Sequence, residues 1–466
     1  MQKKFIYTMP FIQNVVLAFL LFGSTIALDP QDVVFILLSQ KEPYHIAHAD
    51  MMKKYILEQA ENMEKDLPTV LLTHELDITG AWTILPLLPH LYNNYSQKWY
   101  FFFLENTAIR LPKLIDVLNK YNSNQDLWIG HALYDQEPTI IHHFAENARK
   151  FKYPNIASGF AITSKLLNKL AETLLNDRKP SDDFFIDASY EFANFVFKYG
   201  NVRLRHVAEI CIISESKCAT YPKFFHPCGN TVPLKNVFFA VKTCSKYHSS
   251  RTKIVEKTWA KYAHNIGYFT DKTDNSIRNT YIAPNTTRGH CVKTYNILEQ
   301  VSIILENKVI DWIILSDDDT IFSVSRLLRM LTCYNPKTPV AIGERYGYKL
   351  WDDYNGYDYL TGGAGLALSA PLVKKILDEK ACSCPSKDTP DDMFLFGICL
   401  SLINIKPIHC QMLHQARPMD YATAFLAAHE PISFHKFWMV NPETIYNEWF
   451  AEEDSSLYVN KRHTEL

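Results

Sequence analysis

The sequence has no excess of charge of one sign. Its 466 residues include 48 lysines and arginines against 50 aspartates and glutamates, which gives a formal net charge of -2. A chain without a basic surplus has no general attraction for nucleic acid or for an anionic membrane. We therefore expect no nucleic-acid partner, and any charged function must be confined to a local site.

Cysteine is absent from the N-terminal part of the chain. All ten cysteines lie between Cys211 and Cys410. In an oxidising compartment this distribution predicts disulfides in the second half, with a connectivity that the sequence leaves open. A zinc site is the alternative, although the spacing of Cys382 and Cys384 is poor for one.

Long apolar runs are absent beyond the N-terminus. Residues 1–28 contain Lys3 and Lys4, an apolar stretch over residues 11–22, and small residues before a cleavage point after Ala27. This order is typical of a secretory signal peptide, with an uncleaved signal-anchor as the alternative. No later segment approaches the length of a membrane-spanning helix, so the rest of the chain is expected in the lumen of the secretory pathway.

The C-terminal residues 463–466 resemble the His/Lys-Asp-Glu-Leu signal that a retrieval receptor reads, with Thr464 where aspartate is usual. Two N-glycosylation sequons, at Asn94 and Asn285, fit the same compartment. We predict residence in the lumen of the endoplasmic reticulum, as a soluble protein or one held by an N-terminal signal-anchor.

Apolar runs alternate with helical segments, which predicts α/β units. Expected strands cover residues 33–38, 70–73, 237–241, 267–271 and 312–315, and an expected helix covers residues 55–65. Four segments also recur in the same order: residues 99–107 and 312–320, 121–122 and 334–335, 153–163 and 357–369, and 181–185 and 390–394. The repeat predicts two copies of one α/β domain, and chance similarity is the alternative.

We place the first copy at residues 29–230 and the second copy at residues 231–462, because the stretch 211–233 between them is rich in proline. In the second copy the apolar residues 312–315 predict a buried strand, directly followed by Asp317, Asp318 and Asp319. Three carboxylates cannot continue into a core without paired charge. Ligands of open α/β sheets lie outside the carboxyl ends of strands, so this triplet predicts a Mg²⁺ or Mn²⁺ site that holds a diphosphate. A solvated acidic turn or a helix N-cap is the alternative.

The first copy has Leu104, Glu105 and Asn106 at the three aligned positions. Because leucine cannot ligate a metal, we predict that this copy is degenerate. Its remaining role would be to bind an acceptor protein or to brace the second copy.

Further polar residues lie at expected strand ends and turns. Thr243 and Asp271 suit hydrogen bonds to a base and ribose, and Arg251 suits a diphosphate, although each alone is more often a cap or a surface charge. Gly363 lies in the glycine-rich stretch 362–365, which allows backbone to approach a ligand closely or forms a plain tight turn.

Asp391 and Asp392 precede the mixed apolar run 393–403. A carboxylate at this place either caps a helix or removes a proton from an attacking hydroxyl. In an inverting transfer one carboxylate acts as the base opposite the leaving group, and no covalent intermediate is required. His435 lies among aromatic residues, where an imidazole can complete a Mn²⁺ site, although a lone histidine is more often structural.

In their order along the chain these motifs resemble fringe-like β1,3-glycosyltransferases of glycosyltransferase family 31, over roughly residues 235–450. The resemblance implies two tandem GT-A-like (Rossmann-like) domains of the α/β class, the N-terminal copy being degenerate. It further implies an inverting, metal-dependent β1,3-glucosyltransferase with UDP-glucose as donor and Mn²⁺ as metal. The implied acceptor is O-linked fucose on thrombospondin type 1 repeat proteins.

The resemblance also implies roles for single residues. Asp319 and His435 would ligate the metal, Asp317 and Asp318 would lie near the nucleotide sugar, and Asp392 would be the base, with Asp391 as the fallback. The family tends to carry a glycine shortly after this acidic pair, whereas Phe396 precedes Gly397 here. The start and packing of the helix that follows are therefore an open question.

Two other functions compete with this interpretation. One is a fringe-like N-acetylglucosaminyl- or galactosyltransferase, because the donor sugar depends on the shape of a pocket. The other is an inactive lumenal glycan-binding protein built on a transferase fold. The complete triplet 317–319 together with Asp392 argues against the second.

Overall fold

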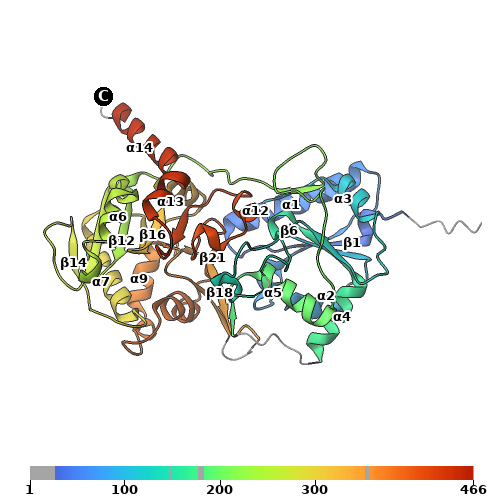
Figure 1. Cartoon of the computed structure of the whole chain (residues 1–466), viewed down its shortest axis with the longest axis horizontal. Helices are drawn as coiled ribbons and strands as arrows, with labels where there is room; N and C mark the ends of the chain where they lie inside the picture. Colours follow the sequence, from blue (N-terminus) through green and yellow to red (C-terminus); the bar gives the residue numbers. More distant parts are fainter. Residues whose placement is uncertain (1–26, 147, 177–182, 352–355, 465–466) are drawn as a thin grey trace, which may run out of the picture.

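The computed structural model describes residues 27–146, 148–176, 183–351 and 356–464, which form a mixed α/β structure (Figure 1). The predicted signal segment lies outside the described residues except for its last two positions, and so do the last two residues of the predicted retrieval signal. Among the described residues, no helix combines the length and the apolar character that a membrane crossing requires.

The first copy is built on a six-stranded sheet in the order β10-β5-β8-β3-β1-β2. Its strands are β1 (Val33–Leu37), β2 (Thr69–Leu72), β3 (Trp99–Phe103), β5 (Trp128–Gly130), β8 (Phe160–Thr163) and β10 (Arg205–His206). Strand β8 is antiparallel to both of its neighbours, and the other pairs are parallel. Every side chain of β1 and β3 is buried, as expected for apolar strands with helices on both faces. These helices are α1 (Pro43–Asn62), α2 (Leu87–Asn94), α3 (Leu111–Leu118), α4 (Ser164–Leu175) and α5 (Ala188–Phe195).

The second copy has a seven-stranded sheet in the order β14-β13-β12-β15-β20-β17-β21. Its strands are β12 (Val237–Lys242), β13 (Asn265–Thr270), β14 (Thr280–Ile282), β15 (Trp312–Asp317), β17 (Ala341–Gly343), β20 (Leu366–Ser369) and β21 (Ile408–His409). Its main helices are α6 (Arg251–Lys257), α7 (Cys291–Asn307), α8 (Val324–Met330), α9 (Ala370–Asp378), α13 (Pro442–Trp449) and α14 (Ala451–Thr464). Here β20 is the antiparallel strand, at the place that β8 has in the first copy. Six strands of the second sheet therefore follow the order of the first sheet, as the sequence repeat predicts, and β14 is an additional edge strand.

A short antiparallel pair beside each sheet repeats as well. Strand β4 (Thr107–Ile109) pairs with β11 (Thr220–Pro222), and β16 (Thr320–Phe322) pairs with β22 (Ser433–His435). In these registers Pro222 lies opposite Thr107, and His435 lies opposite Thr320. Pro222 thus has the place in the first copy that His435 has in the second.

Two predictions of local structure are wrong. The helix predicted for residues 55–65 begins at Pro43, because the Glu42 side chain accepts the backbone N–H of Tyr44 and a proline suits the first helical position. The predicted match of residues 181–185 with residues 390–394 also fails over its described part. Strand β9 (Phe184–Phe185) pairs with β18 (Arg345–Tyr348) of the second copy, whereas residues 391–393 begin a helix.

Disulfides are present as predicted, although Cys211–Cys218 lies within the first copy and not in the second half of the chain. The structure joins Cys211 to Cys218, Cys228 to Cys333, Cys291 to Cys384, and Cys382 to Cys399. The zinc alternative fails because Cys382 and Cys384 both lie in disulfides. Cys244 and Cys410 are free thiols.

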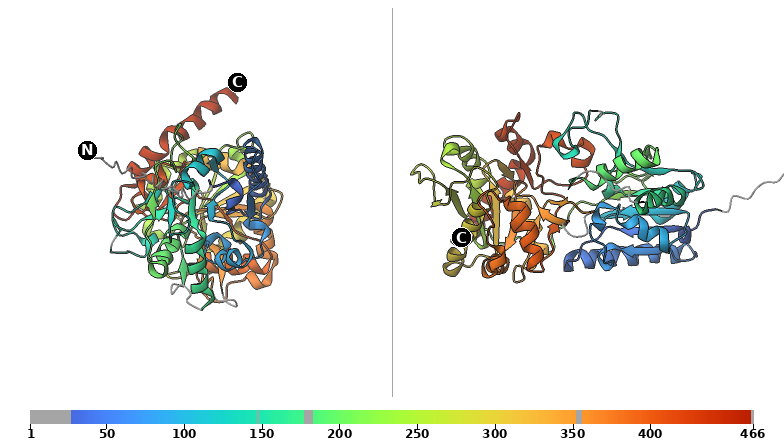
Figure 2. Two further views of the ribbon diagram at one scale, coloured as in Figure 1. Left: turned by 90° about the vertical axis from the view of Figure 1, so that its right-hand side faces the viewer. Right: turned by 90° about the horizontal axis from the view of Figure 1, so that it is seen from below.

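The two copies lie side by side (Figure 2) and are connected by more than the linker between them. Besides the pairing of β9 with β18, Trp82 Nε1 donates to Asp358 Oδ1 at 2.8 Å. Gln40 exchanges two hydrogen bonds with the backbone of His409, at 2.8 and 2.9 Å. Strand β18 pairs with β19 (Tyr357–Leu360), and this pair of strands contacts the first copy through Gly347, Tyr348 and Asp358.

Candidate active site

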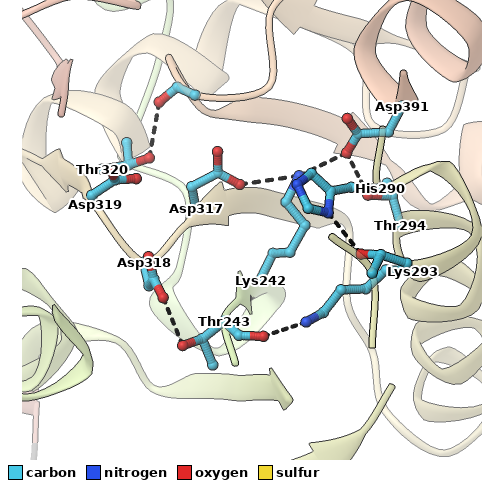
Figure 3. Close-up of polar contacts among 12 residues, drawn as sticks. Lys242, Thr243, His290, Lys293, Thr294, Asp317, Asp318, Asp319, Thr320 and Asp391 are labelled. Carbon is cyan, nitrogen blue, oxygen red and sulfur yellow. Dashed lines mark hydrogen bonds and ion pairs between the residues drawn. The ribbon is translucent and has the colours of Figure 1, made fainter. Parts of the chain in front are cut away.

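The candidate site is built at the carboxyl ends of two neighbouring parallel strands. The register of β12 and β15 places Lys242 beside Asp317. Both strands are buried apolar runs that end in charged residues, so these charges emerge at one edge of the sheet (Figure 3). Asp318 and Asp319 follow at the turn into β16 and are buried.

A carboxylate-imidazole cluster lies at this edge. Pairing of β16 with β22 brings His435 Nε2 to 3.1 Å from Asp319 Oδ1 and 3.8 Å from Asp317 Oδ2. The ligand atoms of these three residues all lie within 4.8 Å of one another. His435 Nδ1 donates to the Gln415 carbonyl at 3.1 Å, which orients the ring so that Nε2 faces the carboxylates. Two carboxylates and one imidazole suit Mn²⁺ or Mg²⁺, and the geometry adds Asp317 to the two ligands that the resemblance implied.

Asp318 points away from this cluster toward the first strand of the copy. Thr243 Oγ1 donates to Asp318 Oδ2 at 2.7 Å, and Arg251 Nη1 lies 3.1 Å from Asp318 Oδ1 and 3.0 Å from Asp319 Oδ2. Burial, together with the adjacent charge of Asp319, raises the pKa of Asp318 to about 6. Burial alone would raise the pKa of Asp319 too, but the hydrogen bond from His435 and the charge of Arg251 lower it.

Lys242 connects the acidic triplet to the acidic pair at the start of α10 (Asp391–Met393). Its Nζ lies 3.1 Å from Asp317 Oδ1 and 2.7 Å from Asp391 Oδ2, and Thr294 Oγ1 donates to the same Asp391 oxygen at 2.6 Å (Figure 3). Burial would lower the pKa of Lys242, but the charges of Asp317 and Asp391 raise it, so the lysine is charged. Asp391 is therefore held in a structural ion pair.

Asp392 has different surroundings from its neighbour. Its Oδ1 accepts the backbone N–H of Met393 at 2.8 Å, and among the described residues it forms no ion pair. Burial and the charge of Asp391 raise the pKa of Asp392 to about 6. Of the two acids, Asp392 is the one whose carboxylate remains available to a substrate proton.

The helix after this pair departs from α geometry over the π-helical segment Phe394–Cys399. Gly397 lies in it, and a Cβ atom there would lie 2.8 Å from Tyr359 Cβ. The first copy has a π-helical segment of its own after α5, at Val196–Gly200. The position of Gly397 thus fits a close approach between this segment and β19.

Gly363 is held against the histidine of the cluster. Its carbonyl accepts Thr320 Oγ1 at 2.8 Å, and a Cβ atom at this position would lie 2.4 Å from the His435 ring. In the first copy Thr107 Oγ1 donates to Ala157 O at 2.9 Å. The methyl group of Ala157 fits at this position because the first copy has Pro222 where the second copy has His435.

Replacement of Gly363 by alanine is therefore expected to displace His435 and weaken metal binding without changing any ligand. We expect activity at low Mn²⁺ to fall about tenfold or more, the range found when groups that orient ligands are altered. Titration of activity against Mn²⁺ measures the effect, and Gly362→Ala is the matched control because nothing lies within 4 Å of a Cβ atom there. Equal Mn²⁺ dependence of both variants would contradict this role of Gly363.

Asp271, like Asp392, has no hydrogen bond or ion pair to the cluster among the described residues. It follows β13 and accepts the backbone N–H and the hydroxyl of Ser245, at 2.6 and 3.0 Å. Asp271 lies at the carboxyl end of β13, and its contact with a nucleotide stays a prediction.

Reasoning from the sequence alone missed Lys242, Thr294 and Gln415. A signal for Lys242 was present, since a lysine ending one apolar strand and an aspartate ending another form a pair when the strands are neighbours. The register was needed to recognise it. Thr294 and Gln415 come from distant segments without a motif.

The sequence model of the Fringe-like family matches residues 88–192 and 232–465. The chain belongs to the fringe-like family. It is 43% identical over 440 residues to a β1,3-glucosyltransferase of Mus musculus, with 92% of this chain and 89% of that protein covered. A β1,3-glucosyltransferase of Homo sapiens is 43% identical over 436 residues, with 92% and 86% covered. Radical fringe of Gallus gallus, a β1,3-N-acetylglucosaminyltransferase, is 26% identical over 217 residues, with 40% and 55% covered.

The similarity to these relatives shows that this fringe-like protein is a glycosyltransferase. The family match also falls on both copies, which agrees with the repeated order of strands. Only the second copy contains the carboxylate-imidazole cluster among the described residues.

Proposed function

We propose that the protein is an inverting, metal-dependent β1,3-glucosyltransferase with tandem GT-A domains. It would transfer glucose from UDP-glucose to the 3-hydroxyl of O-linked fucose on thrombospondin type 1 repeats in the lumen of the endoplasmic reticulum. The observation that carries the proposal is the convergence of Asp317, Asp319 and His435 with Asp391, the neighbour of Asp392, through Lys242. The two β1,3-glucosyltransferases that span nearly the whole chain support the choice of glucose.

In this proposal the second copy positions the donor at the end of β15. Asp317, Asp319 and His435 would hold Mn²⁺, which when bound compensates charge on the diphosphate. Arg251 would contact phosphate oxygens, and Thr243 and Asp271 would contact the nucleoside. Lys242 is a positioning residue, because its charge fixes Asp317 on one side and Asp391 on the other.

Asp392 is the proposed base. The oxygen of the acceptor hydroxyl forms a bond to C1 of glucose while the bond from C1 to the diphosphate oxygen breaks, and UDP leaves with that electron pair. The hydroxyl proton passes to the Asp392 carboxylate, and the configuration at C1 inverts. A buried carboxylate with a raised pKa is a stronger base than an exposed one.

This role predicts a pH dependence. The base must be ionised, so kcat/KM should rise with pH up to about 6, the value to which the pKa of Asp392 is raised, and should level off above it. Since the pKa of Asp318 is also about 6, Thr243→Val is a useful comparison. Loss of the Thr243 hydrogen bond should raise the pKa of Asp318. If protonation of Asp392 causes the fall of kcat/KM at low pH, that fall should occur at the same pH in this variant. An acid limb that moves in Thr243→Val would assign it to Asp318.

A donor and acceptor panel tests the proposed function. The lumenal protein is mixed with Mn²⁺ and UDP-glucose, UDP-N-acetylglucosamine or UDP-galactose, each with a folded thrombospondin repeat with and without O-linked fucose. Transfer from UDP-glucose to the fucosylated repeat alone is expected. Preference for another donor would favour the fringe-like alternatives, and absence of UDP release with every donor would favour a glycan-binding protein.

The location is tested separately from the chemistry. Full-length protein is expected in the endoplasmic reticulum, and a variant that lacks residues 463–466 is expected in the medium, because a retrieval receptor would no longer bind it. Equal retention of both forms would point to the N-terminal segment as an anchor.

A further inference from the structure

A cavity of about 410 Å³ lies between the two copies. Its lining includes Leu104, Glu105 and Asn106, the residues aligned with the acidic triplet of the second copy. It also includes Lys223, whose backbone N–H donates to Asn106 O at 2.7 Å, just as the N–H of Lys436 donates to Asp319 O at 3.1 Å. The cavity is therefore the counterpart, in the first copy, of the candidate donor site.

The second copy covers this counterpart. Glu344, Arg345 and His409 line the cavity from the opposite side, from strands β18 and β21 and the residues beside them. The two copies are held together at this cavity by the hydrogen bonds between Gln40 and His409. A contact of 3.2 Å between His45 Nε2 and the Tyr334 hydroxyl also joins them. A cavity of a few hundred Å³ has the size of a site for a small molecule.

The cavity lacks the ligands for a metal-bound diphosphate. Leu104 and Pro222 have the places of Asp317 and His435, and neither side chain can ligate a metal. The carboxylate of Glu105 is paired with His45 Nδ1. If this cavity has a ligand, charge on it must be met by protein groups alone.

The other acids of the cavity are compensated too. Asp187 Oδ2 lies 3.0 Å from His142 Nε2, and the two neighbouring aspartates raise the pKa of His142 to about 9 although burial alone would lower it. Burial raises the pKa of Glu344 to about 8, so this residue is neutral at pH 7, and its Oε2 accepts the backbone N–H of Gln415. The acids therefore leave little unbalanced negative charge.

The cations of the cavity have no direct ion pairs among the described residues; burial lowers the pKa of Arg345, and the charges of Asp358 and Glu105 only partly offset this effect. The Arg345 guanidinium lies 4.6 Å from the centre of the Trp82 ring, and no ion pair to it is present among the described residues. Its Nε is buried without a hydrogen-bond partner, and so is Nδ2 of Asn155, a residue that is 2% exposed. Lys223 Nζ has a weak contact of 3.7 Å with Met52 Sδ and likewise no ion pair in the described part of the chain. Unpartnered buried donors are costly, so the two on Arg345 and Asn155 indicate an absent acceptor in this cavity, and Lys223 adds a partly buried cation beside them.

We propose that this cavity is a second ligand site, which binds a small sugar derivative carrying a phosphate or carboxylate group, without a metal. The anionic group lies between Arg345 and Lys223, and Asn155 donates to a sugar or acid oxygen. Tyr44 and Trp82 also line the cavity, and aromatic side chains suit the apolar face of a sugar ring. The site is distinct from the catalytic donor site, and it would stand if the proposed donor or acceptor were wrong.

Isothermal titration of the full chain in EDTA tests this site with four probes: glucose 1-phosphate, UMP, glucuronate and glucose. At least one anionic probe is expected to bind, and glucose at least tenfold more weakly. The three anionic probes distinguish a sugar phosphate, a nucleotide and a sugar acid. Failure of all of them to bind, or equal binding of glucose, would overturn the proposal.

Variants locate any binding that is found. Lys223→Met and Arg345→Gln are expected to weaken it at least tenfold, while Lys54→Met, an exposed lysine of α1 paired with Glu58, should leave it unchanged. Asp319→Asn in the other site should also leave it unchanged. Lys223 is only partly buried, so its variant keeps the test valid if Arg345→Gln does not fold. Binding that survives Lys223→Met but is lost in Asp319→Asn would assign the ligand to the catalytic site and refute a second one.

Discussion

Replacement of Asp392 by asparagine is expected to lower kcat for sugar transfer by about 10²–10⁴-fold, the usual contribution of a positioned general base. The asparagine has nearly the same shape and can still accept the Met393 N–H, but it cannot take up the acceptor proton. Donor affinity and the melting temperature should change little. Initial rates at saturating donor and acceptor, with a thermal melt of the same sample, measure the effect.

Asp391→Asn is the matched control, because it changes the adjacent acid in the same way. It leaves Lys242 with Asp317 as its remaining carboxylate partner, so the main loss should be in folding free energy. Breaking one partner of a buried ion pair costs on the order of 3 kcal/mol. A stable Asp391→Asn protein without activity, beside an active Asp392→Asn protein, would reverse the two roles.

Replacement of Asp319 by asparagine is expected to lower both Mn²⁺ affinity and the rate of transfer. A metal ion supplies several kcal/mol of charge stabilisation on a leaving diphosphate. Loss of about 3–4 kcal/mol corresponds to about 10²–10³-fold in rate. His435→Gln should have a smaller effect that high Mn²⁺ concentrations partly reverse, because Asp317 and Asp319 remain.

Binding of Mn²⁺ is measured directly by titration, apart from activity, and EDTA followed by added Mn²⁺ tests reversibility on the unaltered protein. His414→Gln is a comparison outside the cluster, since His414 contacts His429 at 2.9 Å instead. Unchanged Mn²⁺ affinity in Asp319→Asn would exclude this residue as a ligand.

The sequence predicted the sheet strands well where apolar runs end abruptly in charge. Residues 312–315 lie in β15, which ends at Asp317, the first residue of the triplet, because strands buried on both faces admit few polar residues before their ends. The repeat was recognisable for the same reason. The helix start at Pro43 was missed because its cap and proline lie before the apolar pattern begins.

The site was harder to predict than the fold. His435 lies 116 positions from Asp319, and the antiparallel pairing of two three-residue strands brings them together. No local pattern reveals such a pairing, so the resemblance to a family had to supply it. The different surroundings of Asp391 and Asp392 could not be derived from the residues alone either, because they depend on which carboxylate Lys242 contacts.

Strand β9 has a consequence for how this protein can be divided. Residues 184–185 of the first copy complete the edge of the β18–β19 hairpin, and that hairpin holds Tyr359 beside the segment that begins at the acidic pair. A fragment starting at residue 231 would expose this edge to other chains and invite aggregation. The first copy thus covers a strand edge of the second copy, and we expect its removal to lower the solubility of the second copy whatever else the first copy binds.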